Sequence, residues 1–272
     1  MKKKILIPLT AGILVSGCVN TDTRKTEKSI SDTLSSTQEQ TKTTTKIYYT
    51  TNILDHEQQQ SIQKTISAYL NFFNTSLPEI TISEDDTMTD KNTLAYADPW
   101  IIYIVPKNIT TLDKENLDNV IIHELFHSIK PKEAIAIEPY RLKDGSPMIG
   151  FHGLSILVQN GKKQTQFGLI EDAAAVALTS KFKPEFVIQN PYYANIGSLM
   201  LKMIGKWRLT TDNLIQSQKT NDVYFMIGEI IHTNTPTNKN VEDIIWIFNK
   251  VYSTDQDITN EALTEIEVMR KK

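Results

Sequence analysis

The chain has 272 residues, of which 40% are hydrophobic and 22% are charged, and its formal net charge is −3. A chain of this length and composition is expected to fold around one sizeable core. The lack of a broad basic bias argues against nucleic acid as a partner.

The N-terminus has the order of a bacterial export signal. Three lysines are followed by an apolar run from Ile5 to Val15, and the small residues Ser16 and Gly17 precede Cys18. The apolar run is too short to span a bilayer. The stretch VSGC resembles the lipobox of bacterial lipoproteins, in which the Cys is acylated and becomes the mature N-terminus. We therefore predict a lipoprotein signal peptide at residues 1–17 and a lipid anchor at Cys18, with a plain signal peptide as the alternative.

Residues 18–46 form a polar tract rich in Ser, Thr, Gln, Lys and Glu. Such a segment has almost no apolar surface to bury, so we predict a disordered tether. The tether and the lipid would hold the protein outside the cytoplasm at a bacterial membrane. The folded domain is then expected at residues 47–272, with an N-terminal lobe at about 47–131 and a C-terminal lobe at about 132–272.

The N-terminal lobe is predicted to begin with a strand, a helix and two further strands. A strand at 46–54 precedes Asp55, which with Gln58 can form a capping box for a helix that continues to about Asn74. A short strand at 77–83 and a polar loop follow. The stretch at 93–106 then contains a β-branched run typical of a buried strand.

The next stretch, NLDNVIIHELFHSIKP at 116–131, carries the strongest functional signal. Thr110 and Asp113 can cap a helix there, and Pro131 ends it. His127 follows His123 by four positions, so both imidazoles are expected on one face of this helix, within apolar surroundings.

Two neutral imidazoles one helical turn apart can bind one cation, and Zn2+ is the usual one. Glu124 lies between them in the motif H-E-x-x-H, where a carboxylate can take a proton from a zinc-bound water as that water attacks a carbonyl group. The alternative is a histidine pair that is only hydrogen-bonded in a core or exposed on a surface.

A catalytic zinc site needs a third protein ligand. The best candidate is Glu171, in the first turn of an alanine-rich helix that begins after Gly168 and ends before Pro184. A hairpin with strands at 151–159 and 162–167 and a tight turn at Asn160-Gly161 would deliver this helix. An acidic residue at a helix start is also a common partner of the helix dipole, which is the alternative role of Glu171.

Other residues compete as the third ligand. His152 would complete a three-histidine site. Asp144 has the context of a turn former, and Glu133 and Glu138 lie close to the first motif helix in the sequence. The motif helix lacks a third histidine in the H-x-x-G-x-x-H position, which excludes a metzincin.

The stretch from about Thr93 to Ile204 resembles the gluzincins, zincin-fold metallopeptidases that bind one zinc ion through two motif histidines and a Glu from a later helix. The resemblance implies an α+β fold with a small N-terminal mixed sheet, an active-site helix, a β-hairpin and a mainly helical C-terminal lobe. It also implies that His123, His127 and Glu171 bind zinc and that Glu124 is the general base. The thermolysin group has an Asp four residues after the ligand Glu, where this chain has Ala175. Asp172 is a candidate for supporting a metal ligand, but the sequence does not fix the direction of its side chain.

Gluzincins often stabilise the oxyanion with a residue from the C-terminal half. Candidates here are Tyr192, Tyr193 and His232, although a Tyr pair after a Pro is also common in cores. The resemblance places a peptide-binding sheet edge at TLAYADPW, before the buried strand. Four amphipathic helices are predicted within 192–252, and Glu229 with His232 forms a single, weak E-x-x-H pair.

The leading functional hypothesis is a membrane-anchored, extracytoplasmic zinc peptidase that cleaves peptides or proteins. The alternative is a non-catalytic zincin-fold lipoprotein that binds a partner or stabilises a cell-envelope complex. The presence of Glu124 favours the enzyme, because a purely structural zinc ion has no use for a base beside it.

Overall fold

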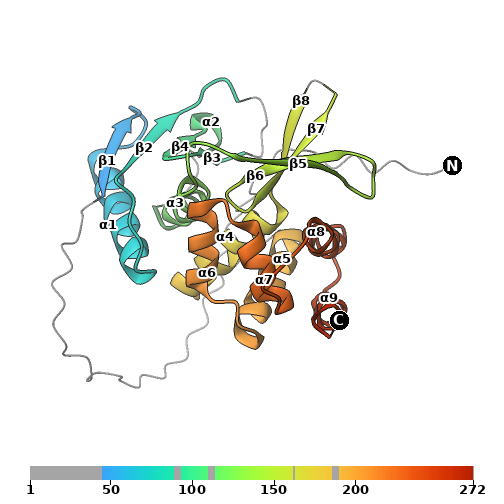
Figure 1. Cartoon of the computed structure of the whole chain (residues 1–272). Coiled ribbons are helices and arrows are strands. Elements are labelled where there is room, and N and C mark those ends of the chain that lie inside the picture. The colour runs from blue at the N-terminus through green and yellow to red at the C-terminus, as the bar shows by residue number, and fades with distance from the viewer. Residues whose placement is uncertain (1–44, 89–92, 110–113, 162, 186–189, 272) are drawn as a thin grey trace, which may run out of the picture.

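The computed structural model describes residues 45–88, 93–109, 114–161, 163–185 and 190–271. The predicted signal peptide, Cys18 and nearly all of the predicted tether lie outside these residues. Within them the fold is α+β, with a small mixed sheet, an antiparallel sheet and a group of helices, as predicted at this level (Figure 1). No helix in these ranges is long and apolar enough to cross a lipid bilayer.

The first sheet lies in the N-terminal lobe and has the strand order β1-β2-β4-β3. Strands β1, β2 and β4 are parallel, whereas β3 is antiparallel to β4 and lies at the end of the sheet. The elements of this lobe are β1 (Lys46–Thr50), α1 (His56–Phe72), β2 (Glu79–Glu84), β3 (Ala95–Asp98), β4 (Ile101–Ile104), α2 (Pro106–Ile109) and α3 (Lys114–Ser128).

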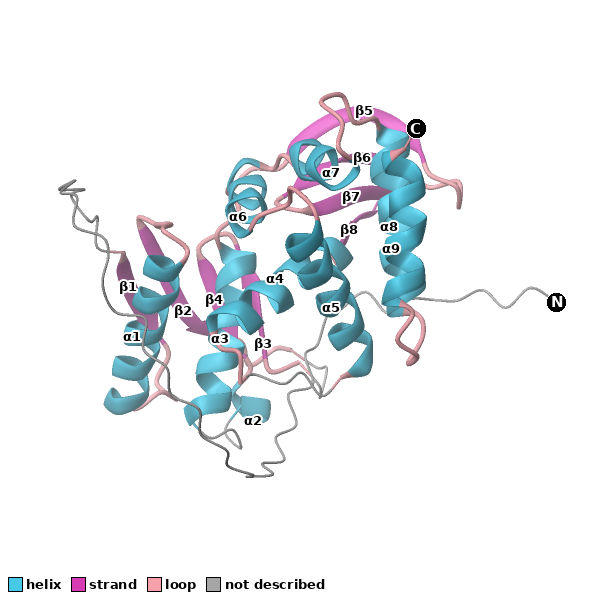
Figure 2. Ribbon diagram, turned by 90° about the horizontal axis from the view of Figure 1, so that it is seen from below, coloured by secondary structure: helices cyan, strands magenta, loops and turns pink. Residues whose placement is uncertain are grey.

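The capping box predicted for α1 is confirmed, because Asp55 and Gln58 each bond the backbone N–H of the other. The apolar face of α1 is buried as its spacing predicts, with Ile62 and Ile66 fully covered. Helices α1 and α3 run beside each other along the first sheet (Figure 2). The predicted caps of α3, Thr110 and Asp113, lie outside the described residues.

The stretch at 93–106 reverses direction, which the apolar run did not indicate. Pro99 and Trp100 form the turn between β3 and β4, and Trp100 has a left-handed φ of 68°. A positive φ is uncommon for a bulky side chain and needs support from its surroundings. The N–H of Trp100 donates to the carbonyl of Ser128 at 2.9 Å, so the turn is tied to the end of α3.

The second sheet is antiparallel, with the order β5-β6-β7-β8, and its strands are β5 (Ile135–Arg141), β6 (Pro147–His152), β7 (Ser155–Asn160) and β8 (Lys163–Phe167). The predicted turn at Asn160-Gly161 is confirmed, and Gly161 has a φ of 62°. The single strand predicted at 151–159 is wrong, because a second left-handed glycine, Gly153, turns the chain within it. Strand β5 was not predicted.

The C-terminal part is helical, as predicted. Its helices are α4 (Leu169–Phe182), α5 (Pro191–Lys206), α6 (Thr211–Thr220), α7 (Val223–Ile231), α8 (Asn238–Tyr252) and α9 (Thr259–Arg270). Helix α4 lies between α3 and the other C-terminal helices (Figure 2). Its alanines allow close packing, and Gly197 of α5 approaches Val176 so closely that an added Cβ would lie 2.0 Å from it. Helix α4 is therefore fixed from both sides.

Candidate metal centre

Helix α3 presents the two motif histidines side by side. Their Nε2 atoms are 3.1 Å apart, and the rings are separated by 4.9 Å between centroids. The rest of the helix surface is packed in the core, with Ile121, Ile122 and Leu125 fully buried. Because rotation of the helix would expose these residues, both imidazoles are held toward the cavity that they line.

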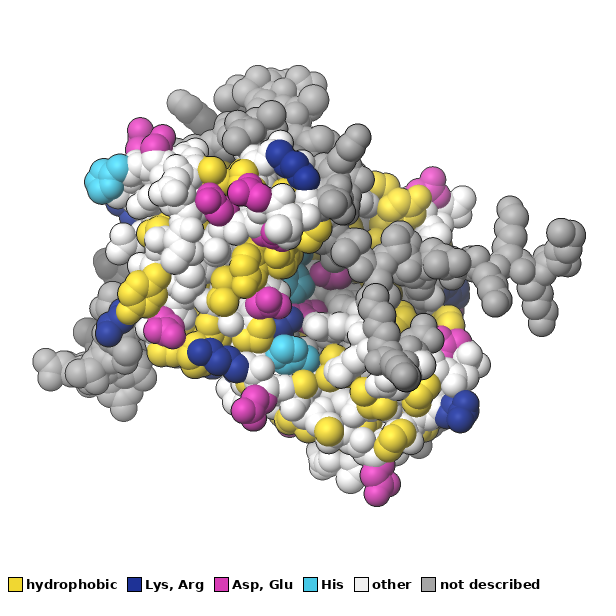
Figure 3. Space-filling model, turned by 90° about the horizontal axis from the view of Figure 1, so that it is seen from above, with side chains coloured by type: hydrophobic (Ala, Val, Ile, Leu, Met, Phe, Trp, Pro, Cys, Tyr) yellow, Lys and Arg dark blue, Asp and Glu magenta, His cyan; other side chains and the backbone are white. Residues whose placement is uncertain are grey.

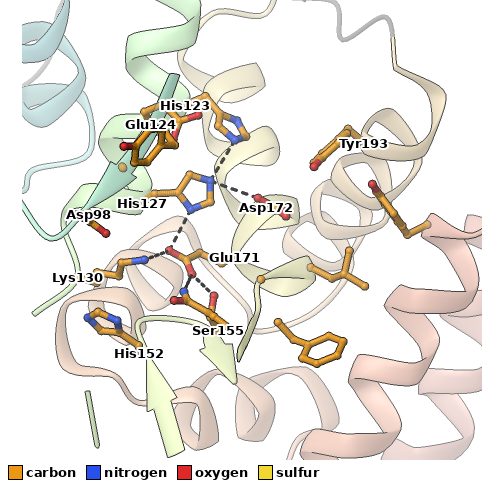
Figure 4. Close-up of a pocket in the computed structure, with 17 residues that line it drawn as sticks. Asp98, His123, Glu124, His127, Lys130, His152, Ser155, Glu171, Asp172 and Tyr193 are labelled. Atoms are coloured by element: carbon orange, nitrogen blue, oxygen red, sulfur yellow. Dashed lines mark hydrogen bonds and ion pairs between the residues drawn. The ribbon is translucent and has the colours of Figure 1, made fainter. Parts of the chain in front are cut away.

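Helix α4 brings two consecutive carboxylates to the same imidazole. Glu171 Oε1 lies 3.0 Å from Nδ1 of His127, and Asp172 Oδ1 lies 3.4 Å from Nε2 of the same ring (Figure 4). Successive residues on a helix are separated by about 100°, so the two side chains leave α4 in different directions and reach opposite edges of the ring. Only the Asp172 side faces His123.

The carboxylate grouped with the two histidines is Asp172, and the prediction that Glu171 binds a metal stays a prediction. One possible ligand atom from each of His123, His127 and Asp172 lies within 4.8 Å of the other two, and these three residues form the metal-compatible group in the described ranges. Glu171 also contacts His127, but it does so at Nδ1, the ring nitrogen that points away from this group. Asp172, to which the sequence assigned no definite role, is the carboxylate that lies with the two histidines.

The surroundings of Glu171 explain its position. Its Oε1 accepts hydrogen bonds from His127 Nδ1, from Lys130 Nζ at 3.3 Å and from Gln218 Nε2 at 2.7 Å. Its Oε2 accepts from the Ser155 hydroxyl and from Gln166 Nε2. A carboxylate has about four lone-pair sites, so five donors saturate it.

The ion pair between Lys130 and Glu171 is buried on both sides, with side-chain exposures of 6% and 2%. Breaking a buried ion pair by withdrawing one partner costs about 3–5 kcal/mol, because the other charge is left without compensation. A shift of Glu171 toward a cation beside His123 would carry such a cost. Asp172 carries no comparable cost, because its carboxylate pairs only with His127 among the described residues.

The geometry of the group fits a small divalent cation. With zinc–nitrogen and zinc–oxygen distances of roughly 2.0–2.2 Å, two ligand atoms of a tetrahedron lie roughly 3.3 Å apart. The observed separations are 3.1 Å between the histidine nitrogens and 3.4 Å between His127 and Asp172. Two imidazoles and one carboxylate are also the donors of catalytic zinc sites. The group could therefore hold a metal ion.

The charges around His127 decide where the protons lie. Burial lowers the pKa of His127, but the hydrogen bond to Glu171 and the Glu171 charge outweigh burial and raise the pKa to about 9. Burial and the neighbouring His127 charge hold the pKa of His123 well below its usual range. His127 is then the donor, with Nδ1–H to Glu171 and Nε2–H to His123. A cation at Nε2 must displace this proton.

Burial raises the pKa of Glu171, yet the Lys130 charge and the His127 hydrogen bond outweigh burial and keep it well below its usual range. Burial raises the pKa of Asp172 to about 6. Glu171 is therefore a permanent anion, and Asp172 is ionised at neutral pH. Two carboxylates that adjoin in the sequence are thus both ionised at neutral pH, but Asp172 takes up a proton at a much higher pH than Glu171.

Glu124 is the remaining motif residue, and burial raises the pKa of its carboxyl to about 8. Its side chain lines the cavity, and it makes no hydrogen bond or ion pair with any other described residue. A carboxyl group with a pKa near the working pH can both accept and release a proton. Glu124 is therefore available for acid–base chemistry next to the three-residue group.

The cavity has a volume of about 380 Å³ and lies where the two sheets and helices α3 and α4 meet. Figure 3 shows a hollow in this face, with histidine and acidic side chains visible among hydrophobic ones. Strand β3 contributes Tyr96, Ala97 and Asp98, and Tyr193 with Tyr252 closes the cavity from α5 and α8. The hollow is large enough for a few residues of a peptide.

The three predicted oxyanion candidates are placed differently. Tyr193 is 4% exposed, lines the cavity and donates a hydrogen bond to Tyr252. Tyr192 is 40% exposed and is not among the cavity-lining residues. His232 is exposed at the end of α7 and does not line this cavity either. Only Tyr193 is in a position to contact a molecule bound there.

The rival ligand candidates do not join the metal-compatible group. His152 lines the cavity, but its Nε2 is 2.8 Å from the carbonyl of Pro131. Asp144 accepts a hydrogen bond from Ser146 N and forms a turn, as expected. Glu133 and Glu138 are exposed and are not among the cavity-lining residues.

The sequence analysis did not predict that several other residues belong to the site. Lys130 offered only a weak signal, because it lies two residues past the end of α3, where helical spacing does not fix the direction of its side chain. Ser155, Gln166 and Gln218 offered none, since they come from separate elements that only the fold brings to Glu171. Tyr252 likewise follows an ordinary amphipathic helix pattern.

The chain was also compared with known proteins. No family model, no curated protein and no solved structure matches it significantly.

Proposed function

We propose that this chain is a zinc-dependent peptidase with a zincin-like arrangement, held outside the cytoplasm by a lipid on Cys18. The observation that carries the proposal is Glu124, which lies on the cavity without a partner among the described residues, next to a group fit for a cation. His123, His127 and Asp172 would hold the ion. When bound, zinc would act as a Lewis acid and lower the pKa of a water molecule to about 7.

The protein's own groups supply the remaining chemistry. Glu124 has a pKa of about 8, so its ionised form is the minor one at pH 7. In that form it accepts a proton from the water that attacks the peptide carbonyl carbon, and it then gives this proton to the departing amine as the C–N bond breaks. Tyr193 can donate its hydroxyl hydrogen to the oxyanion by giving up its hydrogen bond to Tyr252. Burial raises the pKa of Tyr193 well above its usual range, so that hydroxyl stays protonated at all working pH values. Glu171 holds His127 as an Nδ1 donor throughout.

Strand β3 is suited to hold the peptide. It is the last strand of its sheet, and only β4 pairs with it among the described strands. An extended peptide can add to such an edge through backbone hydrogen bonds. Because Tyr96, Ala97 and Asp98 of β3 line the cavity, a peptide bound along this strand would pass the Glu124 carboxylate.

The proposal is tested with the purified chain by measuring bound metal and the cleavage of an unstructured peptide mixture. We expect close to one zinc ion per chain, cleavage that a chelator abolishes, and cleavage restored by added zinc. Zinc bound without any cleavage would favour the non-catalytic scaffold instead. A chain that binds no divalent metal would overturn both roles of the centre.

Metal binding should depend on pH in a defined direction. Because the pKa of His127 is about 9, the ring is protonated at pH 7 and must lose a proton when a cation binds. We expect release of at least about one proton per ion at pH 7, and an apparent affinity that rises by roughly tenfold per pH unit between pH 6 and 8 and levels off above 9. Calorimetry in buffers of different ionisation enthalpy measures the proton count, and an affinity independent of pH would contradict it.

A further inference from the structure

Gln218 is a fully buried polar residue near the end of α6, and it connects three separate parts of the site. Its Nε2 donates to Glu171 Oε1 at 2.7 Å and to the carbonyl of Phe126 at 3.2 Å. Its Oε1 accepts from the N–H of Leu154 at 2.7 Å. One side chain therefore joins the active-site helix, the start of α4 and the turn between β6 and β7.

The fit around Gln218 is specific. Gly153 has a φ of 62°, and a Cβ added there would lie 2.4 Å from Gln218 Oε1. The turn can pass this close only because residue 153 is a glycine. Asn221, one turn further along, accepts from Gly153 N at 2.6 Å and donates to the carbonyl of Glu133 at 2.8 Å. The end of α6 is thus anchored to the same loop independently of Gln218.

Gln218 shares its acceptor with His127. Both donate to Oε1 of Glu171, and Lys130 Nζ is the third donor to that atom. The Gln218 contact is the shortest of the three. Because Oε1 fixes Nδ1 of His127, any group that sets the position of Oε1 also sets the direction of Nε2 toward His123 and Asp172.

We propose that Gln218 is a positioning residue of the metal centre, which acts through Glu171 to aim His127 at the cation. This inference rests on the metal site of the proposed function but not on peptide cleavage. It extends the functional unit to α6, which lies outside the stretch that resembles a known family.

The test compares two variants that each remove a buried amide from the same loop. Gln218→Met keeps the volume and removes the donor to Glu171, whereas Asn221→Gly removes the neighbouring amide, suits the left-handed backbone at that position, and leaves Glu171 untouched. Both should lower the melting temperature of the metal-free protein. Only Gln218→Met should weaken zinc binding, by about 10- to 100-fold in chelator competition.

A second measurement separates positioning from general loss of stability. The visible spectrum of the Co2+-substituted protein reports the ligand field, and it should change in Gln218→Met but not in Asn221→Gly. If Gln218→Met does not fold, Gln218→Leu carries the same expectation. Equal zinc affinities and spectra for wild type and the Gln218 variant would overturn the inference, as would a wild-type chain that binds no metal. Zinc binding without peptide cleavage would defeat only the peptidase assignment.

Discussion

Replacing Glu124 with Gln should reduce peptide cleavage by about 10²- to 10⁴-fold while zinc stays bound. The amide has the shape of the carboxyl group but cannot accept the proton from the attacking water, and general base catalysis contributes a factor of this size. Zinc affinity should change little, because Glu124 lies beside the metal-compatible group and not within it. The measurements are kcat/KM on a cleaved peptide and zinc content per chain.

The control for this variant is Glu138→Gln. Glu138 is an exposed Glu on β5, and the same chemical change there should leave both cleavage and zinc binding at the wild-type level. If Glu124→Gln cleaves peptides as fast as the Glu138 variant, the acid–base role assigned to Glu124 is wrong. A simultaneous loss of zinc would instead mean that Glu124 helps to bind the ion.

The second large effect, on zinc binding, is expected when the adjacent carboxylates Glu171 and Asp172 are each replaced by the corresponding amide. Asp172→Asn should weaken zinc binding by on the order of a hundredfold or more, since zinc-site energies of about 10–16 kcal/mol shared by four ligands give each roughly 2.5–4 kcal/mol. Glu171→Gln should weaken zinc binding less, by about 10- to 100-fold, because it disturbs only the orientation of His127. Competition with a chromophoric chelator at fixed pH measures both.

These two variants are controls for each other, because each exchanges a carboxylate for an amide in the first turn of α4. The expected ranking follows from the hydrogen bonds of Glu171, all of which point away from the His123 side. The reverse ranking, with Glu171→Gln the more damaging, would restore the ligand set that the gluzincin resemblance implies. In that case the contacts seen here would have to rearrange when zinc binds.

The two carboxylates also illustrate how charge is divided in a buried site. Buried positive charges need anions close by, because an uncompensated buried charge is costly. Glu171 pairs with Lys130, whereas Asp172 and Glu124 line the cavity without an ion pair to a lysine or arginine among the described residues. In the proposed function these two carboxylates would face the cation and the substrate.

The sequence by itself determined the parts that depend on short-range spacing. The helix with His123, Glu124 and His127 on one side, the capping box of Asp55 and the turn at Gly161 all follow from residues within a few positions of one another. The alternation of strands and helices and the helical C-terminal part were predicted for the same reason. Hydrophobic periodicity and turn chemistry are local properties, and the sequence displays them directly.

The tertiary structure alone decided the reversals at Trp100 and Gly153, and which of Glu171 and Asp172 lies with the two histidines. All three depend on groups that are distant in the sequence, such as the carbonyl of Ser128 for Trp100 and the side chain of Gln218 for both Gly153 and Glu171. Adjacent helical residues point about 100° apart, so the surroundings decide which carboxylate meets a given ring nitrogen. Those surroundings come from the loop after α3, β7, β8 and α6, and local spacing carries no information about how they meet.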